Sequence, residues 1–172
     1  MEASTLPANY SKKYNSIRWK VIFLSGLLVG TADLLAAFIS FYINTGKSPV
    51  PIVSKFIASG VFGRAALKGG AEMIAAGIFF HYIIAVLFTI FFFWLYQRWA
   101  ALSKNRVITG IVYGIFAWTI MSLIVVPLSK TPPLPASSVG RKLIAILILI
   151  TMIGLPLSFI AKSVTKKSVT EL

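Results

Sequence analysis

The chain has 172 residues, of which 58% are hydrophobic and 12% are charged, and its formal net charge at pH 7 is +13. This composition leaves too little polar surface to cover a soluble globule, so it excludes an ordinary water-soluble domain and indicates a protein that resides in lipid. Cysteine is absent, which excludes a disulfide framework and thiolate chemistry.

Four apolar segments are long enough to cross a hydrocarbon core of about 30 Å, which takes about 20 helical residues. They are Val21 to Ile43, Glu72 to Tyr96, Val107 to Leu128 and Leu143 to Ile160. The sequence therefore predicts an all-α membrane protein, a four-transmembrane-helix bundle in which residues 19–162 form the membrane domain. Residues 1–18 and 163–172 are predicted to be tails.

The Lys and Arg residues lie almost entirely between the apolar runs. Basic side chains in such places meet lipid headgroups, and anionic headgroups attract them. We therefore expect a lipid bilayer with anionic headgroups as the partner of these residues, and no nucleic acid.

An even number of spans places both termini on one side of the membrane, together with the link between the second and third spans. Ten of the basic residues fall on that side and seven on the other. Because basic residues close to span ends are retained on the cytoplasmic side, this distribution predicts that both termini are cytoplasmic.

The connection between the first two spans, residues 44–71, is neither a span nor a tight turn. Pro49 and Pro51 mark its start, and the apolar residues that follow recur at close to helical spacing: Ile52, Val53, Phe56, Ile57, Val61 and Phe62. We expect a short helix at the outer interface. A re-entrant segment is the alternative, because Gly60 and Gly63 weaken a helix. The segment is either a packing lid over the bundle or a substrate gate or partner surface.

Two polar residues of the predicted spans fall at the same depth. Asp33 lies near the middle of the first span, where a carboxylate costs about 2.5 to 3.5 kcal/mol on insertion scales. His81, the only histidine, lies in the second span. Counted from the outer ends of the two spans, their depths agree within about 2 Å at about 1.5 Å per residue. We expect the two side chains to face each other, with Thr151 of the fourth span as a candidate third group.

Small residues recur at helical spacing in every span, and in two spans they form GxxxG patterns. Glycine lets helix backbones approach closely in lipid, where packing and interhelical hydrogen bonds hold a bundle together. The predicted helix-packing positions are Gly26, Gly30, Gly77, Gly110, Gly114 and Gly154.

The sequence lacks the patterns that catalysis or cofactor binding needs. No G-x-S-x-G motif is present, and the serines of the spans lie in ordinary helical runs. One His, no Cys and two acids in the membrane domain make a poor set of metal ligands. We therefore expect no enzyme activity, no cofactor and no metal site.

Three stretches of the chain together resemble a known family. They are VSKFIASGVFGRAALKGGAEMIAAGIFFHYIIAVLFTIFFFWLY, RVITGIVYGIFAWTIMSLIVVPLSKTPP and IGLPLSFIAK. The region from about Leu24 to Lys162 is similar to uncharacterised bacterial inner-membrane proteins of the YagU type. The shared features are an IASG-like interfacial helix, a Gly-Gly pair and G-x-x-x-H at Gly77 and His81; the outer connection is shorter here. The resemblance implies a four-span bacterial inner-membrane protein with an association with acid resistance, and it supplies no catalytic residues.

Two roles are open for the acid and the imidazole. They either form a structural pair that fixes the register of two helices, or they sense or relay protons, because histidine changes its charge between about pH 5 and 8. We therefore predict an integral inner-membrane protein whose molecular activity the sequence does not assign. The sharper hypothesis is that it is pH-responsive or proton-coupled and related to acid stress. The alternative is a structural or assembly protein that binds a small membrane partner, or a second copy of itself, through its GxxxG helix faces.

Overall fold

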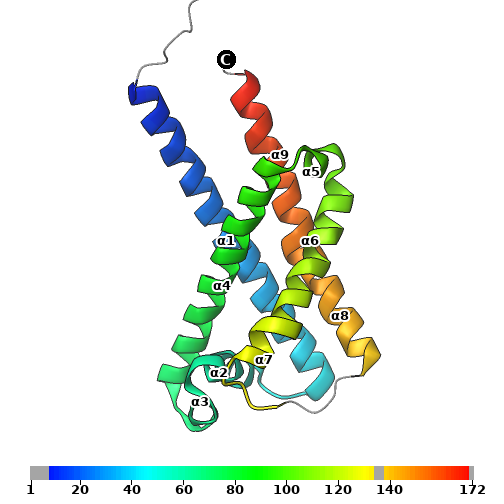
Figure 1. The fold of residues 1–172 in the computed structure, drawn as a ribbon. Helices are drawn as coiled ribbons and strands as arrows, with labels where there is room; N and C mark the ends of the chain where they lie inside the picture. The colour runs from blue at the N-terminus through cyan, green and yellow to red at the C-terminus, as the bar shows by residue number, and fades with distance from the viewer. Residues whose placement is uncertain (1–7, 134–137, 171–172) are drawn as a thin grey trace, which may run out of the picture.

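The chain forms a bundle of long helices that run beside one another (Figure 1). The structure is a computed structural model that describes residues 8–133 and 138–170, and no strand is present within these ranges. Its side chains are described for residues 19–99, 102–133 and 138–163. Residues 1–7 and 171–172 of the predicted tails lie outside the described residues, and the described parts of both tails continue the terminal helices.

Four helical segments among the described residues are long and apolar enough to cross a membrane, which confirms the predicted four-transmembrane-helix bundle. The first is Trp19–Thr45 in α1 (Ala8–Thr45), and the second is α4 (Ala71–Arg98). The third, Arg106–Leu128, consists of α6 (Arg106–Ile120), η1 (Met121–Val125) and α7 (Val126–Leu128). The fourth, Val139–Ser163, consists of α8 (Val139–Leu149), η2 (Ile150–Gly154) and the first part of α9 (Leu155–Thr170). Each segment contains one predicted span. The start of α1 and the end of α9 lie at the same end of the bundle as α5 (Ala100–Lys104), as an even number of spans requires (Figure 1).

The turn from α4 into α6 is held by hydrogen bonds around α5. The Asn105 side chain accepts from the backbone N–H groups of Val107 (3.0 Å) and Ile108 (3.2 Å), donors that the first turn of a helix otherwise leaves free. The hydroxyl of Thr109 donates to the carbonyl of Leu102 (2.7 Å). These bonds connect the start of α6 to the turn that follows α4.

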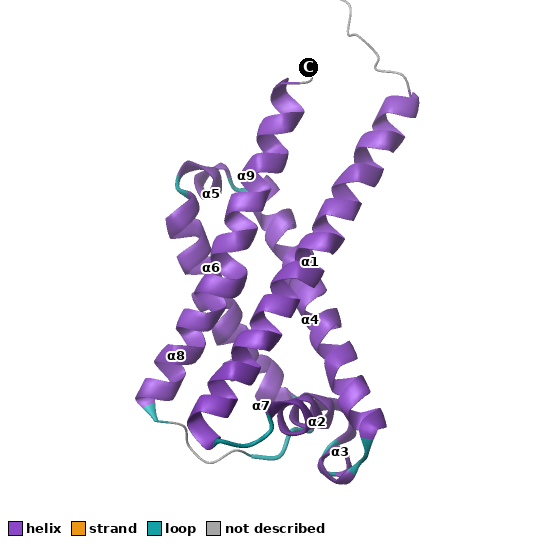
Figure 2. Cartoon of the chain, turned by 180° about the vertical axis from the view of Figure 1, so that it is seen from behind, coloured by secondary structure: helices purple, strands orange, loops and turns teal. Residues whose placement is uncertain are grey.

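The connection between the first two spans forms α2 (Pro49–Phe62) and the short α3 (Ala65–Lys68), so the predicted helix is present. Pro49 occupies the first turn of α2, where a missing N–H costs nothing. The helix ends at Gly63, whose φ of +63° is a conformation that glycine adopts without strain. Both helices lie at the end of the bundle opposite α5 (Figures 1 and 2).

Contacts of α2 close this end of the bundle. The helix packs against α4 and buries Ser54, Ala58 and Ser59. The backbone N–H of Lys130, just after α7, donates to the carbonyl of Gly60 (2.9 Å). The third span is thereby joined to α2, although the two are far apart in the sequence.

Each of the last two spans contains one π-helical turn, and a proline follows each turn at the same distance. The turn η1 ends two residues before Pro127, and η2 ends two residues before Pro156. In η2 the N–H of Leu155 donates to the carbonyl of Ile150, five residues back. Proline has no N–H, so one helical hydrogen bond is missing at its position. The wider turn changes the pairing of backbone hydrogen bonds just before the proline.

The best-buried apolar side chains form one cluster: Ile22, Val29, Phe92, Phe93, Tyr96, Tyr113, Ile153, Leu157 and Ala161. Most of them belong to the half of the bundle nearer α5. Large apolar residues elsewhere on the spans, such as Leu24, Leu35 and Ile39, are exposed, as expected of a surface that faces acyl chains. Asp33 and His81 lie beyond this cluster, toward α2.

Candidate functional site

The structure brings Asp33 and His81 together between α1 and α4, which pack against each other and cross (Figure 2). The Nε2 atom of His81 lies 4.0 Å from Oδ2 of Asp33. The side chains of His81 and Asp33 are 13% and 19% exposed, so both lie mainly in the interface between helices and not against the acyl chains. The juxtaposition expected from equal depth is therefore present.

The imidazole has a closer partner, the backbone of α1. Its Nε2 lies 2.8 Å from the carbonyl oxygen of Gly30, three residues before Asp33. A carbonyl only accepts hydrogen bonds, so Nε2 carries a hydrogen and donates it. The carboxylate, at 4.0 Å, is beyond the range of about 2.7 to 3.2 Å for an N–H···O bond, and it acts on the ring through its charge. Since Nε2 carries the hydrogen of the neutral ring, Nδ1 is the ring nitrogen with a lone pair.

A second polar contact between α1 and α4 lies next to the pair. The hydroxyl of Thr31 donates to the carbonyl of Leu27 (2.8 Å) and lies 2.8 Å from the hydroxyl of Tyr82. Since Thr31 has a single hydroxyl hydrogen, Tyr82 is the donor in the second bond. The Tyr82 ring also lies edge-on to the His81 ring, with centroids 5.8 Å apart. Sequence reasoning missed both residues, although each is within two positions of a member of the pair.

Thr151 does not join the pair, so its prediction as a third group is wrong. Its hydroxyl donates to the carbonyls of Leu147 (2.8 Å) and Ile148 (3.2 Å) in its own span, and its side chain is exposed. The prediction used depth alone, and depth does not determine which way a helix is turned about its axis. Thr151 also belongs to η2, where the wider turn breaks the ordinary helical spacing of side chains.

Gly26 and Gly30 allow α1 to approach α4 closely. A Cβ atom at Gly26 would lie 2.9 Å from Cγ2 of Val86, and one at Gly30 would lie 2.9 Å from Cβ of Ala85. Both distances are below the optimal carbon–carbon separation of about 3.5 to 4.0 Å, so any larger residue would push the helices apart. This close approach brings the Gly30 carbonyl within reach of His81.

The other predicted packing glycines also contact backbone of the same chain. A Cβ atom at Gly77 would meet the carbonyl of Ser54 in α2, and one at Gly154 would meet the carbonyl of Gly110. A Cβ atom at Gly114 would lie 2.5 Å from a backbone carbon of η2. Both GxxxG faces are therefore occupied within the chain, and in this fold they are not open to a partner.

The chemistry that this arrangement can perform is proton binding. Within the described residues no three His, Asp or Glu side chains are close enough to hold a metal ion. Glu72, the other acid of the membrane domain, lies at the first turn of α4 and accepts a hydrogen bond from the N–H of Gly70 (2.6 Å). The pair of Asp33 and His81 thus places two ionisable side chains next to each other inside the bundle.

The bundle and its internal acid–imidazole pair define a multi-pass α-helical membrane protein. No protein-family model, no curated protein and no solved structure matches the chain. The chemistry of the pair is therefore the basis on which a function is assigned.

Proposed function

We propose that this protein is a pH-responsive integral membrane protein in which His81 binds a proton at Nδ1 beside the Asp33 carboxylate. The separation of 4.0 Å between Nε2 and Oδ2, across two membrane-spanning helices, carries this proposal. Protonation replaces a neutral ring beside a carboxylate with an ion pair. Because opposite charges interact more strongly inside a protein than in water, protonation changes the free energy of the contact between α1 and α4.

The proposed setting is acid stress at the bacterial inner membrane. Histidine changes its charge between about pH 5 and 8, so acidification alters the charge of the pair. The resemblance to the YagU type, with its association with acid resistance, supports the same role. The alternative, assembly through the GxxxG faces, has less support because those glycines contact the chain's own helices.

The single histidine allows the protonation step to be measured directly. The full chain, purified without a histidine tag and carrying isotope-labelled histidine, is placed in lipid nanodiscs for nuclear magnetic resonance. We expect the Nδ1 signal to change as the pH is lowered, while Nε2 remains protonated. Asp33→Asn should change the midpoint. An Nδ1 signal that stays constant across about pH 4 to 9 would contradict the proposal.

The physiological role is tested in cells exposed to low external pH. We expect His81→Gln and Asp33→Asn to reduce survival and the control of cytoplasmic pH. Thr151→Val is the matched control, because Thr151 lies in a span but bonds only within its own span. If the two pair variants accumulate normally and perform like the wild-type chain, the proton-sensing role is wrong.

We further propose that both termini and α5 face the cytoplasm, because their side carries ten basic residues against seven. The absence of cysteine makes single-cysteine labelling straightforward. An impermeant maleimide should label Lys47→Cys in cells whose inner membrane is intact, and Lys104→Cys only after that membrane is disrupted. Both positions are exposed at opposite ends of the bundle. The reverse pattern would show the opposite orientation.

A further inference from the structure

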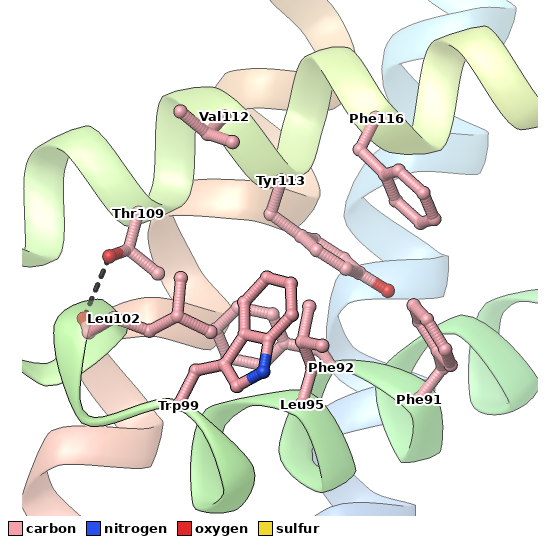
Figure 3. Close-up of a pocket in the computed structure, with 9 residues that line it drawn as sticks. All are labelled: Phe91, Phe92, Leu95, Trp99, Leu102, Thr109, Val112, Tyr113 and Phe116. Atoms are coloured by element: carbon pink, nitrogen blue, oxygen red, sulfur yellow. Dashed lines mark hydrogen bonds between the residues drawn. The ribbon is translucent and has the colours of Figure 1, made fainter.

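A cavity of about 300 Å³ lies between α4 and α6, near the end of the bundle that carries α5 (Figure 3). Its lining includes Phe91, Leu95, Trp99, Val112, Tyr113 and Phe116. Aromatic rings bridge the two helices around it: Phe92 meets Tyr113 with centroids 4.6 Å apart, and Phe91 meets Phe116 at 5.6 Å. The cavity is separate from the acid–imidazole pair and shares no residue with it.

The two hydroxyls of the cavity lining have no hydrogen left to donate, so the indole N–H of Trp99 is the polar hydrogen that the lining side chains retain. Two of its lining residues carry hydroxyls, and both use their hydrogen within the chain. Thr109 donates to the carbonyl of Leu102 (2.7 Å), as Figure 3 shows, and Tyr113 donates to the carbonyl of Phe88 (2.6 Å). Burying a polar group without a new hydrogen bond is costly, whereas burying hydrocarbon is not. The part of a ligand that packs among the other lining side chains, away from the indole N–H of Trp99, is therefore hydrocarbon.

The cavity is reached from the bilayer. Its lining residues Phe91 and Val112 lie on two membrane-spanning segments and are exposed, and Trp99 is exposed directly after the second segment. Acyl chains surround these surfaces in a membrane. A volume of about 300 Å³ is at the lower end of ligand pockets, and it is too small for a helix with a diameter of about 10 Å. A single acyl chain fits this space better than a helix from a second copy.

Positive charge lies at the α5 side of the cavity. Arg98 and Lys104 are exposed, and they are close in sequence to the lining residues Trp99 and Leu102. Neither acid of the described membrane domain is near, because Asp33 lies inside the bundle and Glu72 lies at the opposite end of α4. The nearby Arg106 instead places its guanidinium over the Phe159 ring, 5.2 Å from the centroid. Two exposed basic side chains thus lie at the same end of the bundle as the cavity, and basic side chains there attract anionic headgroups.

We propose that the cavity holds one acyl chain of an anionic phospholipid, whose headgroup is bound by Arg98 and Lys104. The hydrocarbon lining and the access from the lipid match the acyl chain of such a molecule. The two basic side chains match its anionic headgroup. Trp99 lies where the acyl chain joins the headgroup, the level at which tryptophan is enriched in membrane proteins. This site is independent of the proposed proton response.

Trp99 provides the probe for the test. In a full chain with Trp19→Phe, Trp94→Phe and Trp118→Phe, Trp99 is the remaining tryptophan. The chain is reconstituted into vesicles that contain phosphatidylglycerol or phosphatidylcholine with brominated acyl chains, which quench tryptophan fluorescence on contact. A second chain that keeps only Trp94, which is exposed but does not line the cavity, measures ordinary contact with surrounding lipid.

We expect brominated phosphatidylglycerol to quench Trp99 more strongly than brominated phosphatidylcholine, with an association constant about fivefold higher for each basic residue involved. Trp94 should show a smaller difference. Arg98→Gln combined with Lys104→Gln should remove the preference. Arg141→Gln combined with Lys142→Gln, exposed at the opposite end of the bundle, should leave it unchanged.

The hydrocarbon part is tested by filling the cavity. Val112→Phe should reduce the quenching of Trp99, whereas Ile108→Phe, on an exposed face outside the lining, should not. Equal quenching by both lipids, or no effect of Val112→Phe, would overturn the proposal. Quenching of Trp99 by neither lipid would also overturn it, since another protein surface would then cover the cavity. The charge variants alter only exposed side chains, so they test the proposal even if Val112→Phe fails to fold.

Discussion

The carbonyl oxygen of Gly30 lies 2.8 Å from Nε2 of His81, whereas the carboxylate of Asp33 lies 4.0 Å from the same atom. One glycine therefore has two effects on the site. Its missing side chain allows α4 to approach α1, and its carbonyl accepts the hydrogen of the ring. Which ring nitrogen donates thus depends on how closely the two helices pack.

Gly30→Ala should destabilise the folded protein by about 1 to 3 kcal/mol, because the added carbon would lie 2.9 Å from Cβ of Ala85. It should also lengthen the bond from His81 to position 30, which the Nε2 resonance reports. Unfolding in mixed detergent micelles measures the free energy. Gly140→Ala is the matched control, since nothing lies within 4 Å of a Cβ atom there. An equal effect of both substitutions would show that Gly30 is not a packing residue.

Gly154→Ala should cost more free energy of unfolding than Gly30→Ala. The added carbon at position 154 meets the backbone carbonyl of Gly110, and a backbone yields less readily than a side chain. The same unfolding measurement compares the two variants. A smaller loss for Gly154→Ala would mean that the third and fourth spans are less closely packed than described.

Tyr82→Phe should reduce stability by about 0.6 kcal/mol, with an upper limit of about 1.7, the range found for interhelical hydrogen bonds in membranes. The substitution removes the 2.8 Å bond to Thr31 and leaves the ring in place. Tyr42→Phe serves as the control, because Tyr42 is exposed near the end of α1. If Tyr82→Phe has no more effect than the control, the Thr31–Tyr82 bond contributes nothing to the contact between α1 and α4.

Ser54→Ala should leave stability unchanged or raise it by up to about 1 kcal/mol, because a buried polar group without a partner is unfavourable. The Ser54 side chain is fully buried on α2, and its hydroxyl has no hydrogen-bond partner within the described residues. Ser59→Ala is the matched comparison on the same helix. Ser59 is equally buried but donates to the carbonyl of Phe56 (2.6 Å), so its loss should cost about 0.5 to 1.5 kcal/mol. Thermal unfolding that reverses this order would contradict the assignment.

A double-mutant cycle of Asp33→Asn and His81→Gln should give a coupling energy of about 0.5 to 3 kcal/mol. Under the proposed proton response the coupling should be larger at lower pH, because the ring is charged only when both of its nitrogens carry a hydrogen. Unfolding of the wild-type chain, both single variants and the double variant at each pH supplies the values. A coupling energy that does not vary with pH would indicate a structural pair without a proton response.

The sequence by itself determined the number of spans, the side shared by the two termini and the equal depth of Asp33 and His81. All three follow from properties that act along the chain. A bilayer core of about 30 Å selects apolar runs of about 20 residues, and a constant rise of about 1.5 Å per residue converts position into depth. The capped turn at Asn105 and the short helix after Pro49 likewise depend on neighbouring residues only.

Only the tertiary structure decided the rotation of each helix about its axis and its choice of neighbour. In the folded bundle Thr151 points away from the pair, and both GxxxG faces contact other helices of the same chain. A cavity lies between α4 and α6. The tertiary structure also supplied the Gly30 carbonyl as the partner of His81. The physical reason is that lipid is as apolar as the side chains it surrounds, so hydrophobicity does not select which face of a helix turns inward. That choice depends on the fit of shapes and on hydrogen bonds between segments distant in the chain.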